Sequence, residues 1–248
     1  MRVVVFSGTT EGRTLSYTLA DRGIPVEVCV ATEYGKIDQG EHPGVTIRAG
    51  RLTEAEMAAL LDRSTLCVDA THPYATQVTA NIRRAAQRAG AVYKRLLRPA
   101  SPLPEGCWTA RDAAEAVRLL KDTRGNILLT TGAKELTAFA PLGTQRLFAR
   151  VLPLDSSLTA CREAGIAPAR IIAMQGPFGT ELNVALLHQF AIRYLVTKDG
   201  GSPGGFAEKC AAARACGVQL VVLRRPPEDG EPYEQILEFC KEWMAPCR

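Results

Sequence analysis

The chain has 248 residues with a formal net charge of +4; 46% of them are hydrophobic and 23% are charged. This is the composition of a globular protein with a buried core, and the lack of long basic runs argues against nucleic-acid binding. No apolar run approaches the roughly 20 residues of a membrane span, and no secretory signal pattern is visible. We therefore expect a cytoplasmic protein without a membrane partner, and a monomer is the simplest oligomeric state. The eight scattered cysteines favour reduced thiols over disulfides.

The first part of the chain alternates between short apolar runs and stretches with helical spacing of apolar residues. The expected strands cover 3–6, 26–30, 45–48, 66–69 and 92–96, and the expected helices cover 14–22, 54–62 and 75–88. Thr53 and Glu56 have the spacing of a capping box at the start of the second helix. Continuous Val, Ile and Leu strands are typical of a parallel sheet buried on both faces.

A segment rich in proline, about 99–106, breaks this pattern and is the expected linker. Beyond it, the expected strands are 126–130, 146–151, 170–174, 194–197 and 219–223, and the expected helices are 113–121, 157–164, 180–190, 207–216 and 233–244. The sequence thus predicts an α/β protein with two Rossmann-like domains, 1–98 and 107–248, whose mainly parallel sheets face an interdomain cleft. One continuous sheet through both halves is the alternative.

Five expected strand ends carry glycine, threonine and ionisable residues, whereas the other loops are plainer. These strand ends are the segments 7–13, 70–75, 131–135, 175–179 and 198–206. Ligands of open parallel sheets bind beyond the carboxyl ends of the strands. We therefore expect these five segments to form the binding site.

The first of these segments joins a strand to a helix and contains two glycines spaced G-x-x-x-G. Gly8 is expected to allow a tight turn, and Gly12 to allow close approach of a bulky group. Thr9 and Thr10 offer hydroxyl groups, the helix start offers free N–H groups, and Arg13 offers a charged contact to a phosphate. An ordinary capped turn without a ligand remains an equal alternative on this segment alone.

The segment after the second strand is where a cofactor ribose would be recognised. Glu33 could bind a ribose diol, and Lys36 could meet a 2′-phosphate. The balance weakly favours NADP over NAD.

The second loop holds one of three histidines in the chain, His72, followed by Pro73 and Tyr74. Proline can begin a helix and expose the preceding side chain, so His72 is a candidate acid or base and Tyr74 a candidate donor or stacking face. A packing role for His72 is the alternative. His42 and His188 are expected to be structural or surface residues, and no histidine has the paired spacing of a metal site.

The third and fifth loops each place a lysine just beyond a strand. Thr131, Gly132 and Lys134 are expected to join the cofactor site, and Lys198 with Asp199 the catalytic site. Two lysines in such positions favour anion binding, although a solvated surface role is the usual one for lysine.

Taken together, these segments resemble the precorrin-6A reductase family of the corrin branch of tetrapyrrole biosynthesis. The matching segments are GTTEGR (8–13), DATHPYA (69–75), TGAKEL (131–136), MQGPF (174–178), VTKDGG (196–201) and GGFAEK (204–209). The family usually has serine where this chain has Gly179 and Gly200.

The resemblance implies hydride transfer from NADPH, with NADH as the other nicotinamide, to precorrin-6A or its cobalt form, giving precorrin-6B. The substrate is a polycarboxylate tetrapyrrole, which suits a basic cleft formed by Arg13, Lys134 and Lys198. The candidate proton donors are His72, Tyr74 and Asp199, with Lys198 as their electrostatic partner.

Two functions of other classes use the same kinds of loop. One is a non-catalytic nucleotide or tetrapyrrole carrier, against which the number of ionisable residues at strand ends argues. The other is an S-adenosylmethionine-dependent methyltransferase, against which the GTTEGR and TKDGG segments argue.

Overall fold

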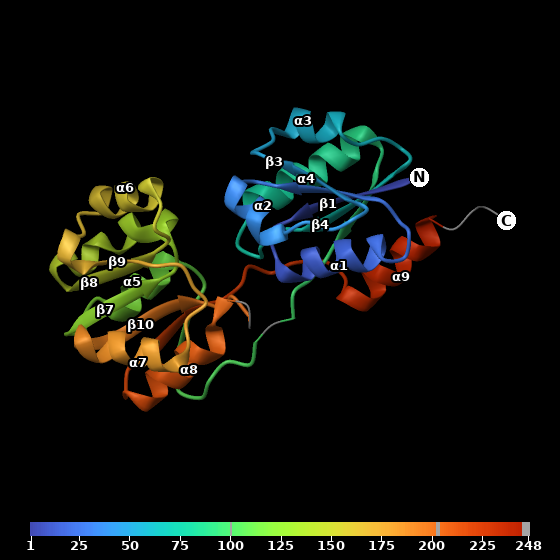
Figure 1. Cartoon of the computed structure of the whole chain (residues 1–248). Coiled ribbons are helices and arrows are strands. Elements are labelled where there is room, and N and C mark those ends of the chain that lie inside the picture. The colour runs from blue at the N-terminus through green and yellow to red at the C-terminus, as the bar shows by residue number, and fades with distance from the viewer. Residues whose placement is uncertain (100, 202–203, 245–248) are drawn as a thin grey trace. The chain divides into compact units, whose positions relative to one another are not determined.

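The computed structural model describes residues 1–99, 101–201 and 204–244 (Figure 1). The chain forms two compact units. Unit 1 contains the residues up to Pro99 together with those from Pro226 onward, and unit 2 contains the chain between them. The sequence-based prediction is different, since it assigned the whole of 107–248, including the C-terminal segment, to the second domain. Part of the expected linker, Ala100, lies outside the described residues.

The C-terminal segment joins unit 1 through backbone and side-chain contacts. The amide of Glu231 donates to the carbonyl of Arg95 at 2.9 Å, and the amide of Leu97 donates to the carbonyl of Glu231 at 2.9 Å. Helix α9 (Tyr233–Met244) lies along α1 (Thr10–Ala20), where the Tyr233 hydroxyl donates to Thr18 at 3.0 Å. The helical pattern of 233–244 predicts an apolar face, but it does not say which sheet that face covers.

Unit 1 is a five-stranded parallel sheet with the strand order β3-β2-β1-β4-β5. Its strands are β1 (Arg2–Ser7), β2 (Val26–Val30), β3 (Val45–Ala49), β4 (Thr65–Ala70) and β5 (Val92–Arg95). Its further helices are α2 (Glu33–Gln39), α3 (Glu54–Ala59) and α4 (Thr76–Ala89).

Both faces of this sheet are buried, as the apolar strands predict. Val3 and Val5 of β1 pack in the cluster that contains α1 and α9, whereas Val4 and Phe6 pack in the cluster that contains α3 and α4. Alternation along a strand sends successive side chains to opposite faces. The predicted capping box of α3 is confirmed, with Thr53 and Glu56 bonded to each other's backbone amides.

Unit 2 is a six-stranded parallel sheet with the strand order β6-β11-β10-β7-β8-β9. Its strands are β6 (Trp108–Ala110), β7 (Asn126–Thr130), β8 (Leu147–Val151), β9 (Ile171–Ala173), β10 (Ile192–Lys198) and β11 (Gln219–Leu223). Its α-helices are α5 (Ala113–Leu120), α6 (Asp155–Glu163), α7 (Thr180–Gln189) and α8 (Phe206–Ala215), and 3₁₀ segments span Ala133–Leu142, Thr144–Arg146 and Pro168–Arg170.

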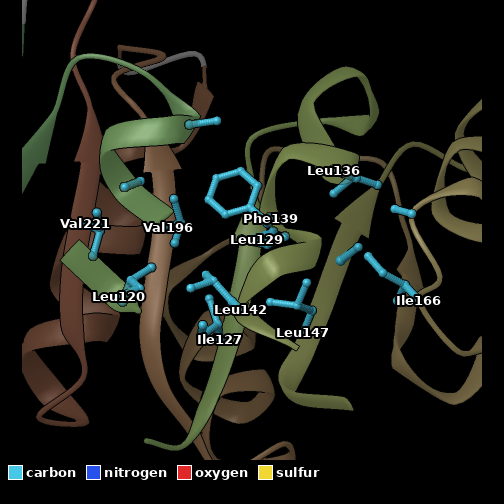
Figure 2. Close-up of a cluster of buried hydrophobic side chains, with 14 of the residues drawn as sticks. Leu120, Ile127, Leu129, Leu136, Phe139, Leu142, Leu147, Ile166, Val196 and Val221 are labelled. Atoms are coloured by element: carbon cyan, nitrogen blue, oxygen red, sulfur yellow. The ribbon is translucent and has the colours of Figure 1, made fainter. Parts of the chain in front are cut away.

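The core on one face of this sheet forms around Phe139, which is fully buried in the 3₁₀ segment after β7 (Figure 2). The same cluster contains side chains from β7, β8, β10 and β11, together with Leu120 of α5 and Ile166 after α6. The opposite face packs against α7 and α8 through Phe206 and Leu187. Unit 2 therefore has helices on both faces, like unit 1.

The prediction of an α/β fold with parallel sheets is confirmed, while helix α2, strand β6 and the three 3₁₀ segments were not expected from the pattern. These elements are short or irregular, so they carry little periodicity. Helix α4 begins at Thr76, one residue after the expected start, and Pro73 lies in the loop before the helix. Within the described chain, no helix combines the length and apolar character needed to cross a membrane.

The buried cysteines behave as small apolar side chains, as their positions in apolar runs predict. Cys67 is fully buried and Cys29 is 5% exposed. Desolvation is the main reason that the pKa of the Cys29 thiol rises to about 12. These thiols are therefore protonated core groups and poor nucleophiles at neutral pH.

Candidate functional site

Each sheet has one point where the chain reverses the direction in which strands are added, and ligands bind at such points. In unit 1 this point lies between β1 and β4, which are followed by the first and second candidate loops. In unit 2 it lies between β7 and β10, which are followed by the third and fifth loops. Four of the five segments expected from the sequence thus lie at the two switch points.

The turn after β1 is a capped helix start. Thr9 is the N-cap of α1, and its hydroxyl accepts from the amide of Gly12 at 3.1 Å and donates to the carbonyl of Ala70 at 2.9 Å. The Thr9 hydroxyl is therefore used to join the turn to the end of β4. Thr10 lies in the first turn of the helix, where amides without a helical partner point toward the sheet edge.

Gly12 serves helix packing rather than the approach of a ligand. A Cβ at this position would lie 2.8 Å from the Cβ of Ala70 and 2.9 Å from the hydroxyl of Ser7. The glycine thus allows α1 to pack closely against β1 and β4. A cofactor contact at Gly12 remains a prediction. The structure explains the glycine by close packing of α1 against the sheet, whereas the sequence suggested close approach of a ligand.

A pocket of about 220 Å³ opens beside this turn at the carboxyl ends of β1 and β2. Its lining includes Ser7, Thr32, Asp38 and Gln39. Gln39 is only 2% exposed, and its side-chain oxygen accepts from Ser7 at 2.9 Å. Its amide nitrogen has no hydrogen-bond partner within the described chain. A buried donor without an acceptor lowers the stability of the fold unless a ligand or a water molecule accepts its hydrogen bond.

The sequence did not single out Gln39, because it belongs to the unexpected helix α2. Glu33 and Lys36, named from the sequence, also lie on α2 and are exposed. Asp38 is instead the acid that lines the pocket. The signal for this site lies in the hydroxyl-capped start of α2, where Thr32 accepts from the amide of Gly35 at 2.9 Å.

Charged side chains at the mouth of the turn are paired. Arg13 donates to the carbonyl of Asp38 at 2.6 Å and lies 3.8 Å from its carboxylate. Glu11 pairs with Arg98 at 2.8 Å, so its negative charge at the helix start is compensated. Arg13 is therefore held by Asp38, which itself lines the pocket.

The second loop places His72 beside Tyr74, as expected. Their ring centroids are 5.5 Å apart, and the amide of Tyr74 lies 3.4 Å from the Nδ1 atom of His72. The amide of His72 would be 3.9 Å from a Cβ at Gly8, so the first and second loops meet at the switch point. Both side chains are partly exposed.

A network of buried charged side chains lies at the end of β4, next to this loop. Asp69 is fully buried at the end of β4, and it accepts from Thr71, from Arg95 at 2.7 Å and from Tyr93 at 3.0 Å. Arg95 also pairs with Glu228 at 2.7 Å. Burial is the main reason that the pKa of Tyr93 is raised, with the Asp69 charge second. The phenol therefore stays a hydrogen-bond donor to Asp69.

The third and fifth loops meet at the switch point of unit 2. The ammonium of Lys198 lies 3.1 Å from the carboxylate of Glu135, which follows β7. Thr131 is 7% exposed, and its hydroxyl has no hydrogen-bond partner within the described residues. Gly132 has φ +86° with no atom near its Cβ position, and Lys134 is exposed. These five residues offer donors and charge to one ligand at this sheet edge.

Asp199 is a buried structural partner in this arrangement. It is 5% exposed, and its carboxylate lies 3.0 Å from the Nε atom of Arg225 and accepts from the amide of Gly201 at 3.2 Å. Its expected role as a proton carrier stays a prediction, and of the named acids it has the strongest fixed partners.

The donors of unit 1 fit part of a nicotinamide cofactor. The pocket near Gln39 is smaller than the pockets that enclose a whole drug-sized ligand, so it suits a ribose or one phosphate with the rest extending outward. Its hydroxyls, amide and helix-start amides match those groups. For metals, the described residues contain no group of three or more His, Cys, Asp or Glu side chains arranged around one ion.

Comparison with known proteins places these features in a family. The model of the family described as Precorrin-6x reductase CbiJ/CobK matches residues 2–242. The chain is 35% identical to the cobalt-precorrin-6A reductase of Salmonella typhimurium, covering 90% of this chain and 87% of that protein. It is 34% identical to the precorrin-6A reductase of Rhodococcus erythropolis, covering 91% and 90%.

A solved structure described as CobK precorrin-6A reductase shares the fold, with a TM-score of 0.77 at 24% identity over 100% of this chain and 99% of that one. The resemblance stated from the six sequence segments is thereby confirmed. With a family match across almost all of its length and two relatives above 30% identity, the chain belongs to the CbiJ/CobK family of precorrin-6x reductases.

Proposed function

We propose that this protein reduces precorrin-6A, or its cobalt form, with NADPH as the electron donor. Membership of the reductase family supports the reaction class. The single structural observation that carries the cofactor assignment is the buried, unpaired amide of Gln39 in the pocket beside the β1 turn. A reduced nicotinamide, when bound, supplies the hydride.

In this proposal, unit 1 binds the cofactor through the turn after β1. The helix-start amides near Thr10 and the pocket hydroxyls bind phosphate and ribose oxygens. The Gln39 amide donates the hydrogen bond that it lacks in the protein alone. Arg13 and Lys36 supply positive charge for the 2′-phosphate that distinguishes NADPH from NADH.

The macrocycle becomes easier to reduce when a nitrogen of its conjugated system is protonated. His72 and Tyr74 are adjacent at the unit 1 switch point, and imidazole is the side chain most often used for proton transfer in catalysis. Lys198, held by Glu135, and Lys134 supply charge that attracts substrate carboxylates at the unit 2 switch point. We assign His72 as the proton donor and Tyr74 as the residue that orients it.

Turnover can be followed by the loss of NADPH absorbance with precorrin-6A and with cobalt-precorrin-6A as alternative substrates. Gln39→Leu removes the unpaired amide at similar volume, so we expect KM for NADPH to rise roughly 10-fold with little change in kcat. Gln235→Leu, an exposed glutamine on α9, is the matched control. An unchanged KM in Gln39→Leu, with normal activity, would place the cofactor elsewhere.

Preference for NADPH over NADH is tested with Lys36→Met. Loss of this charge should raise KM for NADPH several-fold and leave KM for NADH unchanged, because only NADPH carries the 2′-phosphate. Equal effects on both cofactors would contradict this part of the proposal.

A further inference from the structure

Unit 2 contains two buried cations that have no acidic partner. Arg150 of β8 and Lys209 of α8 are each 7% exposed. Neither forms an ion pair with any described residue, and the ammonium of Lys209 makes no hydrogen bond to them. Buried charges in folded proteins are normally paired, because desolvating a lone ion is costly. These two cations therefore lie in the fold without an ion-pair partner among the described residues.

The surroundings hold Arg150 in place without neutralising it. Its Nη1 atom donates to the side-chain oxygen of Asn183 at 2.8 Å, and its Cζ atom lies 4.4 Å from the ring centroid of Phe178. Asn183 in turn donates to the carbonyls of Phe178 at 3.2 Å and Gly179 at 2.8 Å. Neutral and aromatic partners orient the guanidinium while leaving its positive charge uncompensated.

Lys209 lies in the first turn of α8, which begins after two glycines. The N-cap Gly205 has φ +62° and offers no capping side chain, so no described side chain accepts from the helix-start amides. The pKa of Lys209 is lowered to about 8, first by desolvation and second by the positive charge of Arg150. The two cations therefore repel each other. A bound anion would raise the pKa of Lys209 again, because an opposite charge favours the protonated amine.

One acidic residue near the two cations lowers the local positive charge, and this charge indicates which kind of anion fits. Glu208, the neighbour of Lys209, has a buried carboxylate oxygen with no hydrogen-bond partner among the described residues. Two cations and one carboxylate leave a local charge of +1, which complements a monoanion better than a dianionic phosphate. A guanidinium with one side still open binds a carboxylate through two parallel hydrogen bonds.

We infer that Arg150 and Lys209 form a binding site for one carboxylate side chain of the tetrapyrrole substrate. Arg150 is the second-last residue of β8, which neighbours β7, so the site lies on the sheet edge that holds Thr131 and Lys198. One strand spacing is about 5 Å, which a carboxylate-bearing arm of a bound macrocycle can span. The inference rests on the proposed function for the identity of the substrate, and it explains the buried cations independently of the hydride transfer.

The test measures tetrapyrrole binding and turnover in Lys209→Met and Arg150→Met, with Arg214→Met at the exposed end of the same helix as the matched control. Binding without NADPH is followed by the visible absorption of the macrocycle. We expect Kd and KM for the tetrapyrrole to rise roughly 10- to 100-fold in both variants, with KM for NADPH unchanged. In the wild type, KM should also rise above about pH 8, and this rise should be absent in Lys209→Met.

The outcomes separate this inference from the proposed function. Wild-type protein that binds the tetrapyrrole but does not oxidise NADPH would refute the proposed reaction, and the variants' Kd values would still decide the carboxylate site. Unchanged tetrapyrrole Kd in folded variants, or no tetrapyrrole binding by the wild type, overturns the inference. A rise in KM for NADPH alone would assign the site to a cofactor phosphate and also overturn it. If Arg150→Met does not fold, Arg150→Gln replaces it.

Discussion

Replacing Lys209 with methionine should stabilise unit 2 in the absence of ligand, although it removes a charged residue. The pKa of Lys209 falls from its ordinary 10.5 to about 8, mainly through desolvation. Each factor of ten in proton affinity corresponds to about 1.4 kcal/mol, so the buried charge costs the fold about 3 kcal/mol at neutral pH. Methionine has a similar length without the charge, so Lys209→Met should raise the free energy of unfolding by up to about 3 kcal/mol.

The sign of the pH dependence provides a second, independent check. Below pH 8 the amine is charged in both the folded and the unfolded states, and the full cost is present. Between pH 8 and 10.5 the folded state loses the proton while the unfolded state keeps it, so wild-type stability rises relative to the variant. The advantage of Lys209→Met should therefore shrink toward zero near pH 10.5. Arg150, Glu208 and Cys210 also act on Lys209, and both proteins carry the same residues at these three positions.

Urea denaturation at pH 7, 9 and 10.5 measures this difference. Trp108 belongs to unit 2 and Trp243 to unit 1, so a Trp243→Phe background makes tryptophan fluorescence report the unfolding of unit 2. The cysteine thiols titrate in the same range, and a Cys210→Ser background in both proteins removes the thiol whose pKa Lys209 lowers. A less stable Lys209→Met at pH 7, or a difference that does not change with pH, would show that Lys209 is not a desolvated, unpaired charge.

Three further predictions concern unit 1. Asp69→Asn should lower the free energy of unfolding of unit 1 by roughly 3 kcal/mol, because it leaves the buried Arg95 beside a neutral amide. Urea denaturation followed by Trp243 fluorescence measures this free energy. A loss below about 1 kcal/mol would contradict the prediction. Gly12→Ala should lower the free energy of unfolding by roughly 1–3 kcal/mol in the same assay, since the new Cβ would lie 2.8 Å from that of Ala70. Unchanged stability would show that α1 moves freely away from the sheet. His72→Gln should lower kcat with little change in either KM if the imidazole donates the proton, whereas an unchanged kcat would assign the proton to solvent or substrate.

The local sequence pattern was sufficient for most of the secondary structure and for where the site loops fall. Strands 26–30, 126–130 and 219–223 and helix 233–244 match the structure at both ends, because continuous apolar runs and 3.6-residue periodicity depend only on nearby residues. The switch-point loops were likewise visible, since glycine, threonine and ionisable residues gather at strand ends in the sequence itself. The family could be named from six such segments.

Only the tertiary structure decided which segments belong together and which polar groups lack a partner. Helix α9 returns to unit 1 because its apolar face completes the core of α1, a pairing between segments more than 200 residues apart. Gln39, Arg150 and Lys209 appear ordinary in the sequence, and they become notable only because folding buries them without a complete set of partners. Burial and hydrogen-bond satisfaction depend on contacts across the whole sheet, so no local pattern encodes them.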